Sequence, residues 1–170
     1  MLKSVIAVLK VFSDWAATSP LNALVVNAAF VVPAVQVIHI LCVAMILAAV
    51  VMVNLRIFGV TERDEPLRDV TERFLPTLPL ALLALLVTGF VLIVGEPTRA
   101  IYRTVFWVKM GMILLAGVLA ADVRRRARRE EGPAGAGLKA EALTSLLLWF
   151  GVIGAGRWIG YAAGWPGAPA

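Results

Sequence analysis

Four long apolar stretches, separated by charged or turn-forming segments, dominate the pattern of the chain. As helices, such stretches are long enough to cross the ~30 Å hydrocarbon core of a bilayer. We therefore predict an all-α fold, an integral membrane four-helix bundle that occupies residues 32–164. The predicted spans are residues 32–55, 75–94, 104–121 and 143–163. Residues 165–170 form a tail of small residues and proline.

Residues 1–31 show a different pattern, which predicts an amphipathic, interfacial helical segment. Apolar residues recur at helical spacing on one face, with charged residues opposite. These apolar residues are Leu2, Val5, Ile6, Leu9, Phe12 and Trp15. No long central apolar run precedes a small-residue cleavage site, which disfavours a signal peptide. Ser19 and Pro20 are typical of an N-cap and a first helical residue, and Pro33 predicts a break where the first span begins.

The connections between the spans differ in charge. Residues 56–74 mix positive and negative charges and could form a short helix, whereas residues 95–98 predict a tight turn. Residues 122–141 contain five closely spaced arginines and then a glycine-rich run, which predicts a flexible basic loop. The two charged loops carry ten Lys and Arg residues, and the opposite side carries four. The positive-inside rule therefore predicts an inner-membrane protein with both termini in the periplasm.

Composition supports membrane insertion, since 61% of the residues are hydrophobic. The net charge of +5 would suggest a nucleic-acid partner in a soluble protein. Here the cations lie in the loops and help to set topology, so we expect the lipid bilayer as partner and no nucleic acid. A membrane-protein partner or a second copy of the chain is also expected. Cys42 is the only cysteine, which excludes an internal disulfide.

Polar residues inside the predicted spans fall in one layer. The spans alternate in direction, so His39, Thr88, Lys109 and Arg157 all lie in the same half of the bilayer. Ionisable residues at such depth are costly and usually face a bundle interior or a polar cavity. The pattern is what a polar pocket open towards the periplasm would leave in a sequence.

His39 is the main candidate ligand. Its imidazole could bind a haem iron, as in many haem proteins. Lys109 and Arg157 could then pair with the propionates, and Trp158 or Tyr161 could pack on the ring. The alternative is an interhelical hydrogen bond from His39, to Gln36 or Thr88, with no ligand. Since the chain has one His, a haem with two His ligands would require a second copy.

The polar residues of this layer allow other interpretations. His39 and Cys42, with Met45 or Met52, offer the imidazole and sulfur ligands that suit copper. Lys109 and Arg157 could hold an anion or a quinone head group, although Lys109 could also reach the interface. The spacing of Gly156 and Gly160 is typical of helix packing. No nucleophile–base–acid set is present, so we do not expect a stand-alone enzyme.

The segments DWAATSPL, VVPAVQVIHILCVAMIL, NLRIFGV, VTGFVL and LLLWFGVIGAGRWIGY resemble a family of small bacterial inner-membrane proteins of unknown function. The positions that match its pattern are His39, Arg56, Lys109, Arg157, Trp158 and Tyr161. The resemblance implies four helices and no transferable activity. A looser similarity to copper-resistance D membrane domains and to cytochrome-b-like bundles favours redox or metal function. We therefore expect a small inner-membrane cofactor-binding protein, with haem b as candidate cofactor. The alternatives are a non-catalytic scaffold or accessory subunit and a copper or small-solute transport component.

Overall fold

The computed structural model describes residues 2–62, 64–129 and 134–161. The described residues contain helices and no strand, which confirms the all-α prediction. In chain order the helices are α1 (Leu2–Thr18), α2 (Pro20–Asn27), α3 (Val31–Ile57), α4 (Leu67–Phe74), the 3-10 turn η1 (Leu75–Thr77), α5 (Leu78–Gly95), α6 (Pro97–Ile101), α7 (Thr104–Ala127) and α8 (Ala136–Tyr161). The predicted tail, residues 165–170, lies outside the described residues.

Four stretches are long and apolar enough to cross a membrane: Val31–Ile57, Leu67–Gly95, Thr104–Ala127 and Ala136–Ile159. The second of these combines α4, η1 and α5. Large apolar side chains also cover their outer surfaces, among them Leu80, Leu86, Leu114 and Leu147. A helix that is apolar on all sides is typical of a membrane span. The predicted membrane four-helix bundle is therefore confirmed.

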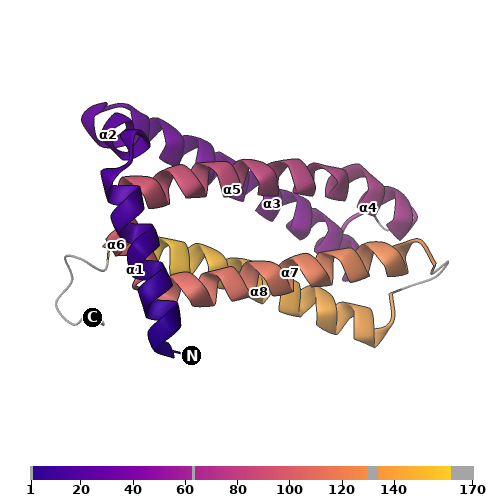
Figure 1. Cartoon of the computed structure of the whole chain (residues 1–170). Coiled ribbons are helices and arrows are strands. Elements are labelled where there is room, and N and C mark those ends of the chain that lie inside the picture. Colours follow the sequence, from indigo (N-terminus) through magenta and orange to yellow (C-terminus); the bar gives the residue numbers. More distant parts are fainter. Residues whose placement is uncertain (1, 63, 130–133, 162–170) are drawn as a thin grey trace.

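The four long helices form two layers, α3 with α5 and α7 with α8 (Figure 1). The layers join mainly where α3 packs on α8. In contrast, α5 and α7 make few direct contacts in the part of the chain that the structure describes. The core lies along α3 and α8 and includes Ile46, Val50, Val53 and Trp149. One flank of the bundle, between α5 and α7, is therefore less tightly closed than the others.

Helix α1 lies across one end of the bundle, roughly perpendicular to the long helices (Figure 1). It packs against α2, α5 and α6. Ser13 and Ala16 are buried, whereas Val8 and Trp15 leave large apolar surfaces exposed. This crosswise position with an exposed apolar side is consistent with a helix that lies in the membrane interface. We call this end of the molecule the α1 end.

The start of α2 follows the prediction. Ser19 is the N-cap, its hydroxyl accepts the backbone N–H of Asn22 at 3.1 Å, and Pro20 is the first helical residue. The amide nitrogen of the Asn22 side chain also donates to the carbonyl oxygen of Val94 at 2.7 Å. This bond satisfies a carbonyl in the last turn of α5 that lacks a helical partner. The chain breaks at residues 28–30, so that Pro33 falls in the first turn of α3, where proline is tolerated.

Helix α3 ends in a Schellman motif. Gly59 has φ of +71°, a conformation that glycine adopts without a steric penalty. The Val60 N–H donates to the Leu55 carbonyl at 2.9 Å, and the Gly59 N–H donates to the Arg56 carbonyl at 3.0 Å. The Arg56 guanidinium in turn donates twice to the carbonyl oxygen of Glu65, at 2.9 and 2.6 Å. Arg56 therefore fixes the connection to α4.

The prediction of a flexible loop over residues 122–141 is wrong for much of that segment. Helix α7 continues to Ala127, and α8 begins at Ala136. Arginine is a good helix former, and a cation in the last turn interacts favourably with the helix dipole. The Arg126 guanidinium also donates to Asp122 at 2.8 Å, one helical turn away. The short helix α6 begins at Pro97, inside the predicted turn, and was not predicted.

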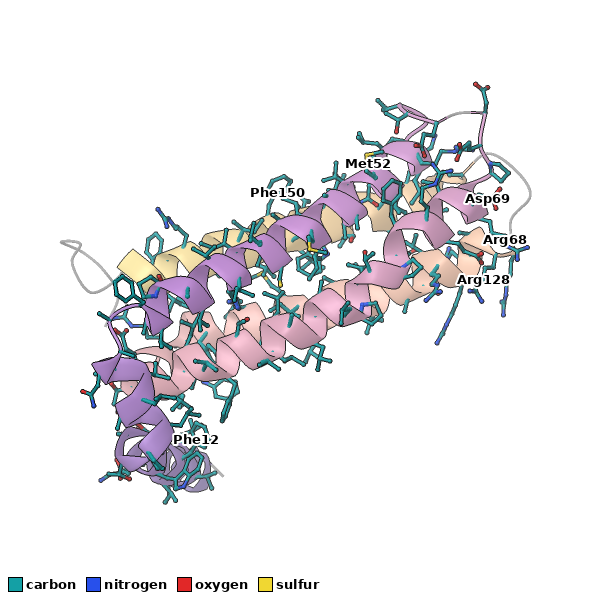
Figure 2. The ribbon with its side chains drawn as sticks, turned by 90° about the horizontal axis from the view of Figure 1, so that it is seen from above. Phe12, Met52, Arg68, Asp69, Arg128 and Phe150 are labelled. Carbon is teal, nitrogen blue, oxygen red and sulfur yellow. The ribbon has the colours of Figure 1, made fainter. Side chains whose placement is uncertain are left out.

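Charged residues gather at the opposite end of the bundle from α1, as the positions of Arg68, Asp69, Arg128 and Phe12 show (Figure 2). We call it the arginine end. Ion pairs there join separate elements: Arg73–Glu65 at 2.8 Å, Arg128–Glu72 at 3.3 Å and Arg126–Glu141 at 3.6 Å. The Arg128–Glu72 pair links the C-cap of α7 to α4, and the Arg126–Glu141 pair links α7 to α8. Exposed pairs of this kind contribute little individually, so the apolar core determines most of the stability.

Candidate functional site

The layer of polar residues lies in the half of the bundle next to the α1 end. His39 is in the first part of α3, Thr88 in the last part of α5, and Lys109 in the first part of α7. Because neighbouring helices run in opposite directions, these positions come to the same depth. His39 Nδ1 lies 2.8 Å from the hydroxyl oxygen of Thr88. The structure thus joins two of the predicted residues directly, across the α3–α5 interface.

The hydrogen bonds of Thr88 favour the His39 tautomer that carries its proton on Nδ1. The single hydroxyl hydrogen of Thr88 is donated to the carbonyl oxygen of Ala84 at 2.7 Å. The hydroxyl oxygen can then only accept from His39, so His39 donates through Nδ1. In a neutral imidazole the other nitrogen, Nε2, keeps its lone pair. His39 therefore has one nitrogen fixed by α5 and one available as an acceptor or metal ligand.

Gly89 contributes to the position of the ring. A Cβ atom built on Gly89 would lie 3.6 Å from Cε1 of His39, which is an ordinary van der Waals distance. The His39 ring consequently lies beside the backbone of α5, next to the hydroxyl that it binds. The side chain is half-buried. Packing and the hydrogen bond together restrict its orientation.

Lys109 extends from α7 towards α8. Its Nζ would lie 3.6 Å from a Cβ built on Gly156, so the ammonium group lies against the α8 backbone. The side chain is half-buried, and its position early in α7 places it at the depth of His39. The absence of a side chain at Gly156 gives the lysine room. Lys109 and His39 therefore belong to one polar layer supplied by three helices.

The remaining predicted site residues lie differently. Arg157 and Trp158 are exposed on α8, with 40% of the Trp158 surface accessible. Tyr161 is the last residue of α8, and its side chain lies outside the described residues. The structure therefore brings together His39, Thr88 and Lys109, but it places Arg157 on the outer surface of the bundle.

The residues of the copper interpretation do not converge in one chain. Cys42 is buried one turn after His39, whereas Met45 is 54% exposed. Within the described ranges no three His, Cys, Asp or Glu residues lie close enough to hold a metal ion.

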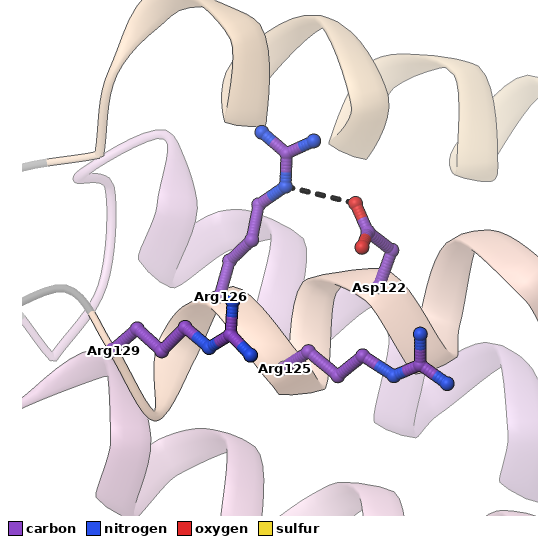
Figure 3. Close-up of a pocket in the computed structure, with 4 residues that line it drawn as sticks. All are labelled: Asp122, Arg125, Arg126 and Arg129. Carbon is purple, nitrogen blue, oxygen red and sulfur yellow. Dashed lines mark hydrogen bonds and ion pairs between the residues drawn. The ribbon is translucent and has the colours of Figure 1, made fainter.

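Two cavities at the arginine end were not predicted. One has a volume of about 450 Å³ and is lined by Asp122, Arg125, Arg126 and Arg129 (Figure 3). The other, about 530 Å³, lies between α5 and α7 and reaches Trp149 of α8. The cluster of arginines was visible in the sequence, but nothing there placed it beside a groove. The small residues that open this groove also have no distinctive pattern.

Together the fold and the polar layer define a helical membrane protein with an ionisable site inside its bundle. The chain belongs to DUF6644, a family of unknown function, which matches residues 12–162. This confirms the predicted membership of an uncharacterised family. No curated protein and no solved structure matches the chain.

Proposed function

We propose that this protein is a small inner-membrane cofactor-binding protein, in which the layer formed by His39, Thr88 and Lys109 holds a redox cofactor. Haem b is the candidate, and Nε2 of His39 would hold its iron. The observation that carries this proposal is the 2.8 Å bond between His39 Nδ1 and Thr88. Histidines that bind metals commonly donate their second N–H to a fixed acceptor, which orients the ring and sets the tautomer.

The charge of Lys109 supports the same assignment. A haem carries two propionates, and an ammonium group inside a low-dielectric site is a suitable counter-ion. Haem would supply one-electron chemistry. The residues of the chain would ligate it, neutralise a propionate and exclude water. Because the chain contains one His, a haem with two His ligands would require a homodimer or a partner subunit.

The orientation is part of the proposal. The arginine end would lie in the cytoplasm and the α1 end in the periplasm, as the excess of Lys and Arg predicts. The polar layer would then open towards the periplasmic side, with α1 in the outer interface. Both termini would be periplasmic.

The alternative function is a non-catalytic scaffold or accessory subunit. The same His39–Thr88 bond favours it, because interhelical hydrogen bonds stabilise membrane bundles without any ligand. The exposed positions of Arg157 and Trp158 fit a contact with a partner protein. Copper or small-solute transport has weaker support, because the possible ligands beside His39 do not converge.

The proposal is tested with the protein purified in mild detergent. Absorption spectra are recorded in the oxidised and the dithionite-reduced form, and the metal content of the same sample is measured. Haem must be available during expression. We expect a Soret band that sharpens on reduction and is lost in His39→Ala. Thr88→Val should lower haem affinity about 10–100-fold, as loss of a supporting hydrogen bond does in metal sites. Lys109→Leu should weaken haem retention because it removes the proposed counter-ion, whereas Arg157→Leu, outside this layer, should keep the band.

Gln36→Ala is the matched control, since Gln36 lies on the same helix one turn before His39 and is exposed. It should keep the band. A colourless, metal-free protein would refute the cofactor proposal and favour the scaffold. Stoichiometric copper without a chromophore would favour transport.

A further inference from the structure

The groove between α5 and α7 is the most distinctive cavity of the arginine end. Its volume is about 530 Å³. Leu78 and Leu82 of α5 form one wall, Gly117 of α7 lies on the other, and Trp149 of α8 lines it as well. It lies on the flank where α5 and α7 make few direct contacts. An apolar space of this kind, open to the bilayer, must be filled by lipid or by another apolar group.

Small residues on α7 keep the groove open. Gly117, Ala120 and Ala121 line it, and a Cβ atom built on Gly117 would meet nothing within 4 Å. The space beside Gly117 is therefore sufficient for additional carbon atoms. Gly111, on the same helix, also has nothing within 4 Å, but it does not line the groove.

The groove becomes strongly basic at the arginine end. Arg124, Arg125 and Arg128 line this part of it. Arg124 lies seven residues after Gly117 on α7, which corresponds to a distance of about 10 Å along the helix. Arg128 forms an ion pair with Glu72 at 3.3 Å, and among the described residues neither Arg124 nor Arg125 has one. The groove thus joins an apolar channel to a positively charged mouth.

Two buried donors lack acceptors at this site. Trp149 is 2% exposed, and its indole N–H has no hydrogen-bond partner among the described residues. The Nε–H of Arg124 is also buried without a partner. Buried polar groups are nearly always satisfied, and inside a membrane an unsatisfied group is especially costly. Among the described residues that line the groove, none is acidic.

The neighbouring cavity extends the basic mouth. Arg125 lines both cavities, and Arg126 and Arg129 line the cavity of about 450 Å³ (Figure 3). The acidic residue there, Asp122, accepts a hydrogen bond from Arg126 at 2.8 Å. Its charge is therefore largely compensated, and the mouth keeps an excess of guanidinium groups.

We propose that this groove is a binding site for one anionic glycerophospholipid. The phosphate lies against Arg124 and Arg125, and an acyl chain follows the channel past Gly117. Basic pockets between membrane helices are suited to anionic head groups. A small soluble anion would leave the apolar channel unfilled, and an apolar helix of a second copy would leave the arginines without negative charge. The proposal does not depend on a cofactor at His39.

Native mass spectrometry tests the proposed lipid site. Delipidated protein is titrated with dioleoylphosphatidylglycerol and, separately, with dioleoylphosphatidylcholine. We expect one phosphatidylglycerol to bind in preference to phosphatidylcholine. Arg124→Gln should weaken phosphatidylglycerol binding about fivefold, as expected for the loss of one membrane-facing cation. Gly117→Leu should fill the channel and reduce binding of both lipids.

The matched controls are Gly111→Leu and Arg68→Gln, because Gly111 does not line the groove and Arg68 is an exposed arginine of the same end. Both should bind phosphatidylglycerol like the unmodified protein. Arg124→Lys keeps the charge and should retain most of the preference, which separates loss of charge from misfolding. Equal binding of the two lipids, unchanged binding by Gly117→Leu, or a dimer that forms in place of the lipid complex would each overturn the proposal.

Discussion

Replacement of Thr88 by valine tests the central contact of the polar layer. Valine has nearly the shape of threonine but cannot accept the N–H of His39. The two atoms lie 2.8 Å apart, and Thr88 is 8% exposed, so the contact is short and well shielded. Interhelical hydrogen bonds in membrane bundles contribute about 0.6 kcal/mol on average and up to about 1.7 kcal/mol. Because this bond is short and buried, we expect about 1 kcal/mol.

A double-mutant cycle isolates this contribution. Thr88→Val also removes the local bond to Ala84, which is 2.7 Å long. The cycle pairs Thr88→Val with His39→Phe, and the local bond cancels because it is lost whether or not His39 is present. Unfolding in mixed dodecylmaltoside–SDS micelles, followed by far-UV circular dichroism, gives the four free energies of unfolding. The coupling between the two positions should be about 1 kcal/mol.

Two further variants complete the test. Thr88→Ser keeps the hydroxyl and should retain most of the coupling. Thr144→Val removes a local bond of the same type, from Thr144 to Ala140 at 2.9 Å, at an exposed site of α8. It should show no coupling to His39. A His39–Thr88 coupling below about 0.3 kcal/mol, which is within ordinary additivity error, would refute the hydrogen bond and with it the assignment of the His39 tautomer.

Three other predictions concern the ends and the core of the bundle. Ser19→Ala removes the N-cap of α2 and should reduce stability by about 1 kcal/mol, measured by the same unfolding assay. Gly95→Ala would place a methyl group 3.0 Å from Val25 and should destabilise the α2–α5 contact, with faster hydrogen exchange in α2 as the readout. Trp149→Phe removes no hydrogen bond within the protein and should reduce stability by on the order of 1 kcal/mol, against about 3–5 kcal/mol for Trp149→Ala. A Trp149→Phe loss as large as that of alanine would show that the indole N–H is satisfied within the fold.

The length of the apolar stretches predicted the spans well because the bilayer imposes their length and composition. The beginning of α2 at Ser19-Pro20 was predictable for a different reason, because capping depends only on adjacent residues. The common depth of His39 and Thr88 also followed from alternating helix directions. The sequence did not show which side of each helix faces inward. An apolar helix in a membrane is apolar on all sides, so periodicity gives no direction. Arg157, deep in the last span, therefore gave no sign that it would lie on the surface of α8.

The groove near Trp149 was beyond prediction for a related reason. It depends on how closely α5 and α7 approach, which is decided by packing between helices that are distant in sequence. The helical continuation of α7 into its arginines was missed because charge was read as a sign of a loop. In this chain the arginines extend the helix beyond its apolar part, and Arg126 pairs with Asp122 along it.

The bond from Asn22 to the carbonyl of Val94 has a consequence for the order of events during translation. Its partners are separated by 72 residues, so the α2 contact cannot form until almost all of α5 has been synthesised. At roughly 5–20 residues per second, the N-terminal helices must wait on the order of 4–15 s for their acceptor. During that interval the exposed apolar side of α1 has only lipid or a chaperone to contact. The N-terminal segment is therefore made first but cannot reach its final position before α5 is complete.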